Sequence, residues 1–206
     1  MDIELLKILK RKENLEILRN EINFNWVSVK IKNHLLRNPY LNLTVEEVKN
    51  KIMNDDLIGS FYIKDPSKQN ISENVIGEFI YKIDGVNDFI NHPSNVNLFI
   101  LDGKITNKRE DGIKSIDYSW TFKNKKIYAT QKYTNEPGGA QDHQFNEVIQ
   151  FLKHSSLNED DFFIAIVDGN YYTDEKISIL KKYETKNVKV CNFLEIKRVM
   201  YEHIKN

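Results

Sequence analysis

Residues 113–133, IKSIDYSWTFKNKKIYATQKY, decide how this chain of 206 residues folds. Apolar and polar side chains alternate along the first half of this stretch, and a second β-rich segment follows a tight Lys123-Asn124 turn. Two alternating segments joined by a short turn predict an antiparallel hairpin, with strands at 113–122 and 125–132. The hairpin places Asp117 and Lys132 on neighbouring strands, where both can face the same end of a sheet.

Downstream of the hairpin, the sequence alternates between helical and strand patterns. The continuous apolar run 162–167 is typical of a strand covered on both faces. Helical periodicity and a second short apolar run predict the remaining elements, which are helices at 140–154, 173–183 and 193–204 and a strand at 188–191. Because a hairpin is followed by strand-helix-strand crossovers, we expect an α/β fold with a central mixed β-sheet flanked by helices.

Upstream of the hairpin, helical patterns dominate. Ser72 begins a predicted helix that continues to about His92, followed by a strand at 96–101, whereas the type of 58–65 is ambiguous. Nearer the N-terminus, apolar spacing predicts one helix over 2–22, with a break near Glu13 left open, a second over 26–37, and a third after Thr44. We therefore divide the chain into a helical N-terminal region, 1–56, and an α/β core, 57–206.

Composition narrows the function classes. The 30 basic and 30 acidic residues balance, which argues against a general nucleic-acid coat protein and permits a DNA enzyme only if its charges are segregated. No apolar run approaches the roughly 18 residues of a membrane-spanning helix, so we expect no membrane partner. The start, MDIELLKILKRKENLEIL, lacks the basic and apolar regions of a secretory signal, which predicts a cytoplasmic protein.

The Asp117 and Lys132 pair has the chemistry of a phosphodiesterase site. An aspartate can hold a divalent cation, and a neighbouring lysine can orient an attacking water and stabilise charge that develops on a phosphate. The alternative is an ordinary ion pair between two exposed strand residues, and the pair alone does not decide between them.

From Ser72 to Glu195 the chain resembles the PD-(D/E)XK nuclease superfamily, especially type II restriction endonucleases. The core of that family runs helix, three-stranded meander, helix, strand, with its aspartate on the second strand and its lysine on the third, the places of Asp117 and Lys132. The segment KYTNEPGGAQDHQ, 132–144, is similar to the segment after the catalytic lysine in several restriction enzymes, and 163–169 looks like their next core strand.

The resemblance implies a restriction-endonuclease-like core that uses Mg²⁺. It also implies that Asp117 is a metal ligand, that Lys132 assists the attacking water, and that the Gln131 carbonyl is a further ligand. The chain departs from the motif in two places: no proline precedes Asp117, and Thr130 stands where the family has an acid. Glu147, on the following helix, and Glu78, on the preceding one, are candidates to replace the missing carboxylate, although either could lie on a solvated helix face.

Residues 137–144 form a second candidate cluster. Glycine lets the backbone approach a phosphate, and the start of a helix offers unpaired N–H groups. The candidate DNA-binding residues are Gly138, Gly139, Gln141, His143 and Gln144. An ordinary loop and helix cap is the alternative. For a third cluster, 168–172, a turn is favoured over a site.

These observations predict a Mg²⁺-dependent, sequence-specific endonuclease that hydrolyses phosphodiester bonds of double-stranded DNA, as a type II restriction enzyme of a restriction system does. Such enzymes commonly act as homodimers on palindromic sites, so we expect a homodimer. Two alternatives stay open: a catalytically inert DNA-binding protein on the nuclease fold, and a structure-specific repair nuclease. The N-terminal helices could contact DNA or dimerise.

Overall fold

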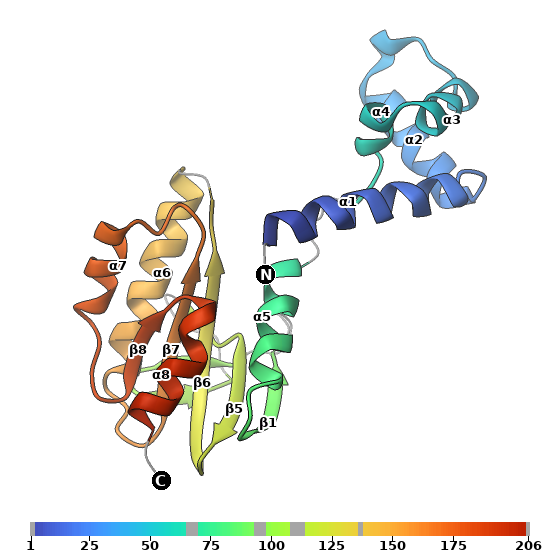
Figure 1. Ribbon diagram of the computed structural model, residues 1–206. Helices are drawn as coiled ribbons and strands as arrows, with labels where there is room; N and C mark the ends of the chain where they lie inside the picture. The colour runs from blue at the N-terminus through green and yellow to red at the C-terminus, as the bar shows by residue number, and fades with distance from the viewer. Residues whose placement is uncertain (1–2, 65–69, 93–97, 108–113, 136–137, 205–206) are drawn as a thin grey trace. The chain divides into compact units, whose positions relative to one another are not determined.

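The computed structural model describes residues 3–64, 70–92, 98–107, 114–135 and 138–204. The chain divides into two compact units, Met1–Ser72 and Glu73–Asn206, whose elements are labelled in Figure 1. The first unit is helical, and the second is built around a β-sheet.

The helical unit contains α1 (Ile3–Asn20), α2 (Asn25–Arg37), a short 3-10 turn (Pro39–Leu41), α3 (Val45–Asn54) and α4 (Asp56–Ser60). The first helix runs without a break at Glu13. Thr44 and Glu47 form a reciprocal capping box at the start of α3, as the threonine predicted. A small core holds the helices together, with Leu15, Leu18, Val27, Ile31, Val48, Ile52 and Tyr62 buried.

The boundary between the units lies at Ser72, beyond the boundary at residue 56 that the sequence predicts. The physical reason is that the segment after residue 56 contributes to the helical core. Tyr62 is buried in that core, and Ile58 and Ile63 pack against it. The segment of ambiguous type is therefore helical at α4 and belongs to the first unit.

The second unit is an α/β domain. Its main elements are α5 (Ile71–Tyr81), β1 (Val86–Asn91), β5 (Tyr118–Phe122), β6 (Lys125–Tyr133), α6 (Gly139–Ser155), β7 (Phe162–Asp168), α7 (Asp174–Lys181), β8 (Val188–Cys191) and α8 (Ile196–His203). The five strands form one sheet in the order β1-β5-β6-β7-β8. Because β1, β5 and β6 are antiparallel whereas β6, β7 and β8 are parallel, the sheet is mixed, as expected.

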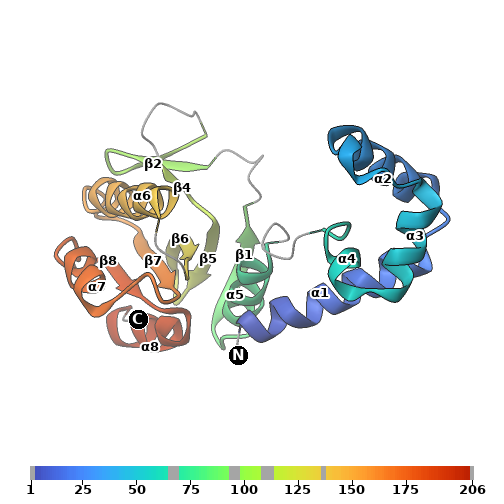
Figure 2. The same cartoon turned by 90° about the horizontal axis from the view of Figure 1, so that it is seen from above.

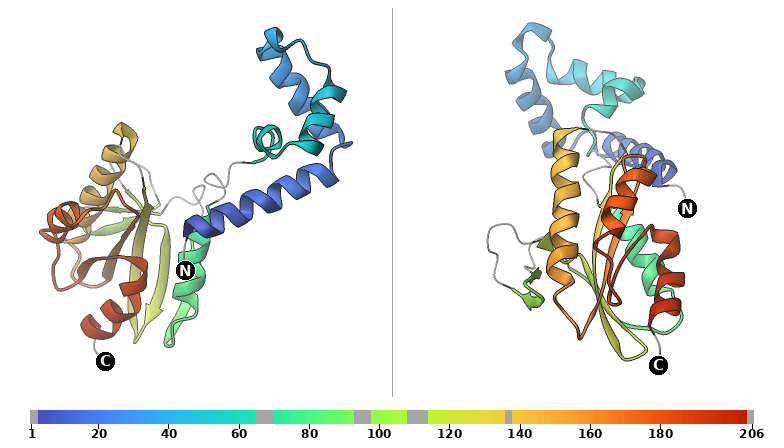
Figure 3. Two further views of the ribbon diagram at one scale, coloured as in Figure 1. Left: turned by 45° about the horizontal axis from the view of Figure 1, so that its top comes forward. Right: turned by 90° about the vertical axis from the view of Figure 1, so that its left-hand side faces the viewer.

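Each face of the sheet carries its own apolar core. On one face, Ile76 and Ile80 of α5 and Val199 and Met200 of α8 pack against Trp120 and its neighbours. On the other face, Val148, Phe151 and Leu152 of α6 and Leu180 of α7 pack against β7 and β8. Figure 3 shows α6 on one side of the sheet and α5 and α8 on the other. The helices therefore flank the sheet on both faces.

The predicted helix from Ser72 to His92 is wrong beyond Tyr81. The chain turns at Gly85, whose φ of +84° favours glycine, and continues as strand β1. β1 pairs with β5 in an antiparallel register, and Phe89 stacks against Tyr118. The helical spacing of Ile83 and Val86 was misleading because strand pairing overrides a short apolar periodicity.

Residues 96 and 97 of the strand predicted at 96–101 lie outside the described residues, and Phe99–Leu101 belongs to a separate small sheet. This sheet has the order β3-β2-β4, from β2 (Phe99–Leu101), β3 (Lys104–Thr106) and β4 (Lys114–Ser115). It lies beside α6, with Ile100 buried in the same core as α6, and Figure 2 shows the two side by side. The first strand of the meander is consequently β1, and the small sheet is an insertion between β1 and β5.

The hairpin at the centre of the sheet is confirmed. Tyr118 pairs with Ala129 and Phe122 with Lys125. Lys123 and Asn124 have φ of 49° and 62°, the two left-handed residues of a tight hairpin turn. The predicted strand 113–122 is not continuous, however, because Ile116 and Asp117 separate β4 from β5.

Candidate active site on the two central hairpin strands

Asp117 lies where the chain passes from the small sheet to the main sheet. Its amide nitrogen donates to the Ala129 carbonyl (2.8 Å), so the residue is anchored to β6. Its carboxylate oxygen Oδ2 accepts two hydrogen bonds, from the Thr130 hydroxyl (3.0 Å) and from the Gln131 backbone N–H (2.7 Å). The backbone and side chain of β6 together therefore fix the orientation of this carboxylate.

Lys132 is paired with Glu147 of α6. The lysine Nζ lies 3.2 Å from the glutamate Oε2, and the two side chains are 19% and 33% exposed. Side chains two residues apart on a strand point to the same face, so Thr130 and Lys132 both face α6. The structure thus brings Asp117, Thr130, Lys132 and Glu147 to one face of the sheet.

His143 extends this group on the helix side. It lies one helical turn before Glu147, and its Nδ1 is 3.8 Å from the Glu147 Oε1. The histidine side chain is 78% exposed. One carboxylate oxygen of Glu147 therefore lies near the largely buried Lys132, and the other lies near the exposed His143.

Glu78 lies on the other side of the sheet from α6. Its side chain is 70% exposed and pairs with Lys82 of the same helix at 3.7 Å. Its helix, α5, packs on the face opposite α6. Glu78 therefore lies on a solvated helix face, which was the alternative to a role in the site. Glu147, in contrast, lies beside Lys132.

Glu73 of α5 is an acidic residue that the sequence analysis did not identify. The Tyr118 hydroxyl donates to its backbone carbonyl at 2.8 Å. Burial raises the pKa of Tyr118, and the negative charges of Asp117 and Glu73 raise it further. The Tyr118 hydroxyl is therefore held to the backbone of α5, a contact that has no signal in the spacing of the sequence.

His92 is a second residue that the sequence analysis missed. Its amide donates to the Asp117 carbonyl (2.8 Å), and its Nε2 shares a hydrogen bond with the Ser119 hydroxyl (2.8 Å). Burial lowers the pKa of His92, and the charge of Lys126 lowers it further against the opposing effect of Asp117. The sequence predicts a helix for this segment, and a helix does not bring His92 next to Asp117. The contact depends on the pairing of β1 with β5.

The glycine and glutamine segment lies at the start of α6. Gly138 is the N-cap residue, and its carbonyl accepts from the Gln141 and Asp142 amides. Gln144 accepts a hydrogen bond from the Thr134 hydroxyl at 3.1 Å, which ties α6 to the loop after β6. Gly139 begins the helix and has open space around it. Pro137 lies outside the described residues.

The candidate residues include oxygen donors, which are the ligand type that Mg²⁺ takes. Within the described ranges, no three His, Cys, Asp or Glu side chains gather as a metal-binding group. Mg²⁺ is commonly held by only one or two carboxylates, with water and phosphate oxygens completing the shell. Asp117, Glu147 and the backbone carbonyl of Gln131 provide oxygen donors of this kind. The side chain of Gln131 is buried, and its Nε2 has no hydrogen-bond partner among the described residues.

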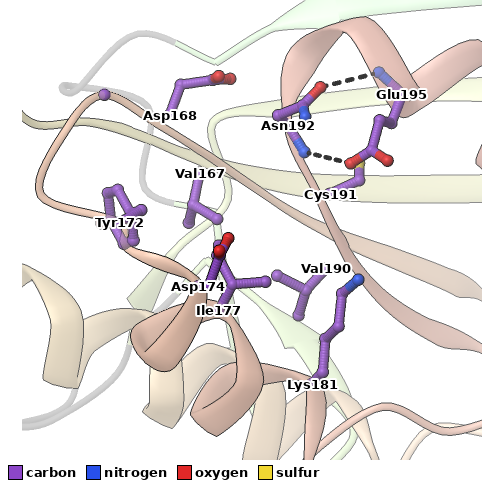
Figure 4. A pocket seen from close by; sticks show the side chains of 11 residues that line it. Val167, Asp168, Tyr172, Asp174, Ile177, Lys181, Val190, Cys191, Asn192 and Glu195 are labelled. Atoms are coloured by element: carbon purple, nitrogen blue, oxygen red, sulfur yellow. Dashed lines mark hydrogen bonds between the residues drawn. The ribbon is translucent and has the colours of Figure 1, made fainter.

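A separate pocket of about 310 Å³ lies at the carboxyl ends of β7 and β8 (Figure 4). Asp168 lines it and accepts a hydrogen bond from the Phe193 amide (2.8 Å). Burial raises the pKa of Asp168 to about 6, with the charge of Glu195 adding to the effect and the hydrogen bond opposing it. Asn192 and Glu195 form a capping box with each other. Asp168, Asn192 and Glu195 thus hydrogen-bond to the backbone beside the pocket.

The segment after Asp168 is a turn, as the sequence favours. Gly169 has a φ of +97°, and a Cβ at this position would collide with the Thr134 carbonyl. That carbonyl accepts from the Tyr171 amide (3.0 Å), and the Thr134 amide donates to the Asp168 carbonyl (2.9 Å). The turn therefore fixes the loop that follows Lys132.

Comparison with known proteins places the chain in no family. No protein-family model matches it, no curated protein matches it, and no solved structure matches it. None of the described helices has the length and apolar character needed to cross a membrane.

Proposed function

We propose that this protein is a Mg²⁺-dependent endonuclease that cuts double-stranded DNA at specific sequences, as a type II restriction enzyme does. The observation that supports it most is the position of Asp117. Its carboxylate is held against Thr130 and the Gln131 amide of the neighbouring strand, and Lys132 follows on that strand. An anchored carboxylate with a lysine on the adjacent strand is the minimum equipment for metal-assisted phosphodiester hydrolysis.

Each residue of the site has a distinct task in this proposal. Asp117, Glu147 and the Gln131 carbonyl would hold the Mg²⁺, which supplies charge neutralisation and lowers the pKa of a bound water. Lys132 orients the attacking water and stabilises negative charge on the scissile phosphate. Thr130 fixes the Asp117 carboxylate, and Glu147 positions the lysine through their 3.2 Å ion pair.

DNA contact is proposed for the start of α6. The helix begins at Gly139, around which there is open space, and the N-terminus of a helix favours phosphate. Gln141, His143 and Gln144 lie in the first turns of α6; His143 is largely exposed, whereas Gln144 accepts from the Thr134 hydroxyl. Because palindromic sites have two-fold symmetry, the proposed enzyme acts as a homodimer.

A catalytically inert DNA-binding protein is the second candidate. It is favoured by Thr130, a neutral residue where the resembled motif has an acid. A hydroxyl does not neutralise a divalent cation as a carboxylate does. A structure-specific nuclease would share the site and differ only in where it cuts.

The test is incubation of long duplex DNA with the protein and Mg²⁺, with EDTA as the reference. The proposal expects discrete fragments from the wild type and none from Asp117→Asn. Asp88→Asn is the matched control, because Asp88 is exposed on β1 and its φ of 53° suits asparagine. A smear would support the structure-specific nuclease, and specific binding without cutting would support the inert protein.

A further inference from the structure

Helix α2 is apolar on two opposite faces. Its inner face, with Val27 and Ile31, is buried in the core of the helical unit. Its outer face presents Trp26, Val29 and Leu36, which are 43%, 45% and 79% exposed. A helix at the surface of a protein normally turns charged and polar residues outward. The outer face of α2 is therefore built for contact with something other than water.

The outer positions of α2 have the spacing of a helix-pairing seam. Trp26, Val29, Asn33 and Leu36 follow one another at intervals of three, four and three residues, which places them in one stripe. One amide among apolar residues is a common feature of such seams, because it selects one register at some cost in stability. The stripe thus resembles one side of a two-helix interface.

The two ends of this stripe carry opposite charges. At the first end, the Trp26 indole donates to the Glu21 carboxylate at 2.8 Å, so a negative charge sits beside the tryptophan. At the other end, Arg37 lies next to Leu36 in the last turn of the helix and is exposed. A stripe that is acidic at one end and basic at the other is complementary to a copy of itself turned end for end.

We infer that the outer face of α2 pairs with α2 of a second copy of this chain in an antiparallel arrangement. A two-fold axis brings Trp26 of one copy beside Leu36 of the other and sets Val29 against Asn33. It also brings Glu21 of each copy to the level of Arg37 of the other. Two identical ion pairs then close the two ends of the apolar seam.

The character of the face favours a second copy over DNA. Surfaces that bind the DNA backbone are rich in lysine and arginine, whereas none of the four outer positions of α2 is charged. Of the two lysines that flank the stripe, Lys30 donates its ammonium group to the Tyr62 carbonyl at 2.6 Å, and Lys32 is exposed. The inference names a surface and a partner independently of any cleavage activity.

The first experiment measures the mass of the full chain in solution, without DNA or metal, by sedimentation equilibrium. We expect a dimer, and we expect Leu36→Glu to raise the dissociation constant by about a hundredfold or more, since it removes a buried leucine and places a charge in the seam. Leu57→Glu is the matched control, because Leu57 is 67% exposed on α4 of the same unit. Circular dichroism establishes that both variants fold.

The second experiment tests the antiparallel register by charge exchange. Glu21→Arg and Arg37→Glu should each raise the dissociation constant about tenfold or more, because each sets two like charges against each other. An equal mixture of the two variants should associate again, since every facing pair is then opposite in sign. Failure of the mixture to associate overturns the antiparallel arrangement.

Three results would overturn the inference. A monomeric wild-type chain would show that the face does not pair with a second copy. A dimer that Leu36→Glu leaves intact would place the interface elsewhere. A monomer whose duplex binding is weakened by Leu36→Glu would make the face a DNA contact. A monomer would also remove the homodimer from the proposed function, whereas the cleavage activity is tested separately because none of these measurements uses it.

Discussion

The Thr130 hydroxyl donates a 3.0 Å hydrogen bond to the Asp117 carboxylate across the central hairpin. The threonine is fully buried, and the same carboxylate oxygen also accepts from the Gln131 amide. A neutral donor of this kind orients the carboxylate but adds no negative charge beside it. The relationship therefore assigns Thr130 the role of positioning Asp117, and it leaves any second ligand charge to another residue.

Replacing Thr130 tests that positioning role. Thr130→Val keeps the shape of the side chain and removes the hydrogen bond, which to a charged partner contributes about 1.5 to 3 kcal/mol. We expect Mg²⁺-dependent cleavage to fall about ten- to a hundredfold, less than in Asp117→Ala, and Thr130→Ser to restore most of it. Single-turnover rates on a duplex substrate measure the effect. A Thr130→Val protein that cuts at the wild-type rate would refute the role.

The pairing of Lys132 with Glu147 predicts coupled losses. Glu147→Gln removes the partner of the lysine and a proposed ligand charge, so cleavage should fall by at least about a hundredfold. Lys132→Met should also remove cleavage. If the two act as one unit, the double variant should be little worse than either single variant. If the loss of cleavage in the double variant equals the sum of the two single losses in free energy, the residues act independently.

The two acidic residues of α5 test the assignment of the site to the α6 face. Glu73 contacts Tyr118 through its backbone carbonyl, and Glu78 is solvated and pairs with Lys82. Because α5 packs on the face of the sheet opposite α6, we expect Glu73→Gln and Glu78→Gln each to leave the cleavage rate unchanged. The same single-turnover assay measures both. Loss of cleavage in Glu78→Gln alone would restore the assignment made from the sequence.

The central part of the fold could be predicted because its signals are local. The Lys123-Asn124 turn and the alternation around it define the hairpin, and the run 162–167 defines a buried strand. Asp117 and Lys132 follow from that hairpin, since strand register determines which residues meet. Glu147 follows from the helix that crosses from one strand to the next, and its contact with Lys132 depends on the packing of that helix.

The features that the sequence does not predict depend on contacts between distant parts of the chain. β1 is a strand because β5 lies beside it. The apolar spacing of Ile83, Val86 and Ile90, in β1 and just before it, also fits a helix. The contribution of His92 follows from that pairing, because its amide meets Asp117 across the two strands. The proximity of Glu73 requires the packing of α5 on Tyr118. Neither relationship is encoded in the spacing of residues along the chain.

Asp168 predicts a dependence of stability on pH. Its pKa rises from 3.8 to about 6 on folding, mainly through burial. The folded state therefore binds the proton more tightly than the unfolded state, and the free energy of unfolding falls as pH rises from about 4 to about 6. Asp168→Asn should flatten this dependence and raise the free energy of unfolding at pH 7 by up to about 2 kcal/mol, allowing for solvent screening.

Urea unfolding of both proteins at pH 4 and pH 7 measures this effect. The asparagine oxygen can still accept from the Phe193 amide, so the variant keeps the local hydrogen bond. Equal pH dependence in the wild type and the variant would contradict the prediction.

The turn beside the site requires glycine at position 169. Gly169→Ala forces a side chain into a left-handed conformation and against the Thr134 carbonyl, so it should destabilise the protein by about 3 kcal/mol. Gly139→Ala is the control, because that glycine begins α6 with nothing within 4 Å of an added Cβ. Thermal unfolding measures both. Equal midpoints for the two variants would count against the strained turn.

The tight turn at Lys123 and Asn124 has a consequence for the order in which the molecule assembles. A hairpin closed by a short turn forms in microseconds, whereas parallel pairing waits for a crossover to close. Asp117 and Thr130 lie within the hairpin, so their hydrogen bond forms when the two strands pair. Glu147 reaches Lys132 only after α6 has crossed to β7. On a ribosome, the nascent chain would orient its aspartate before its lysine, and the candidate catalytic pair would stay incomplete until the second half of the sheet emerged.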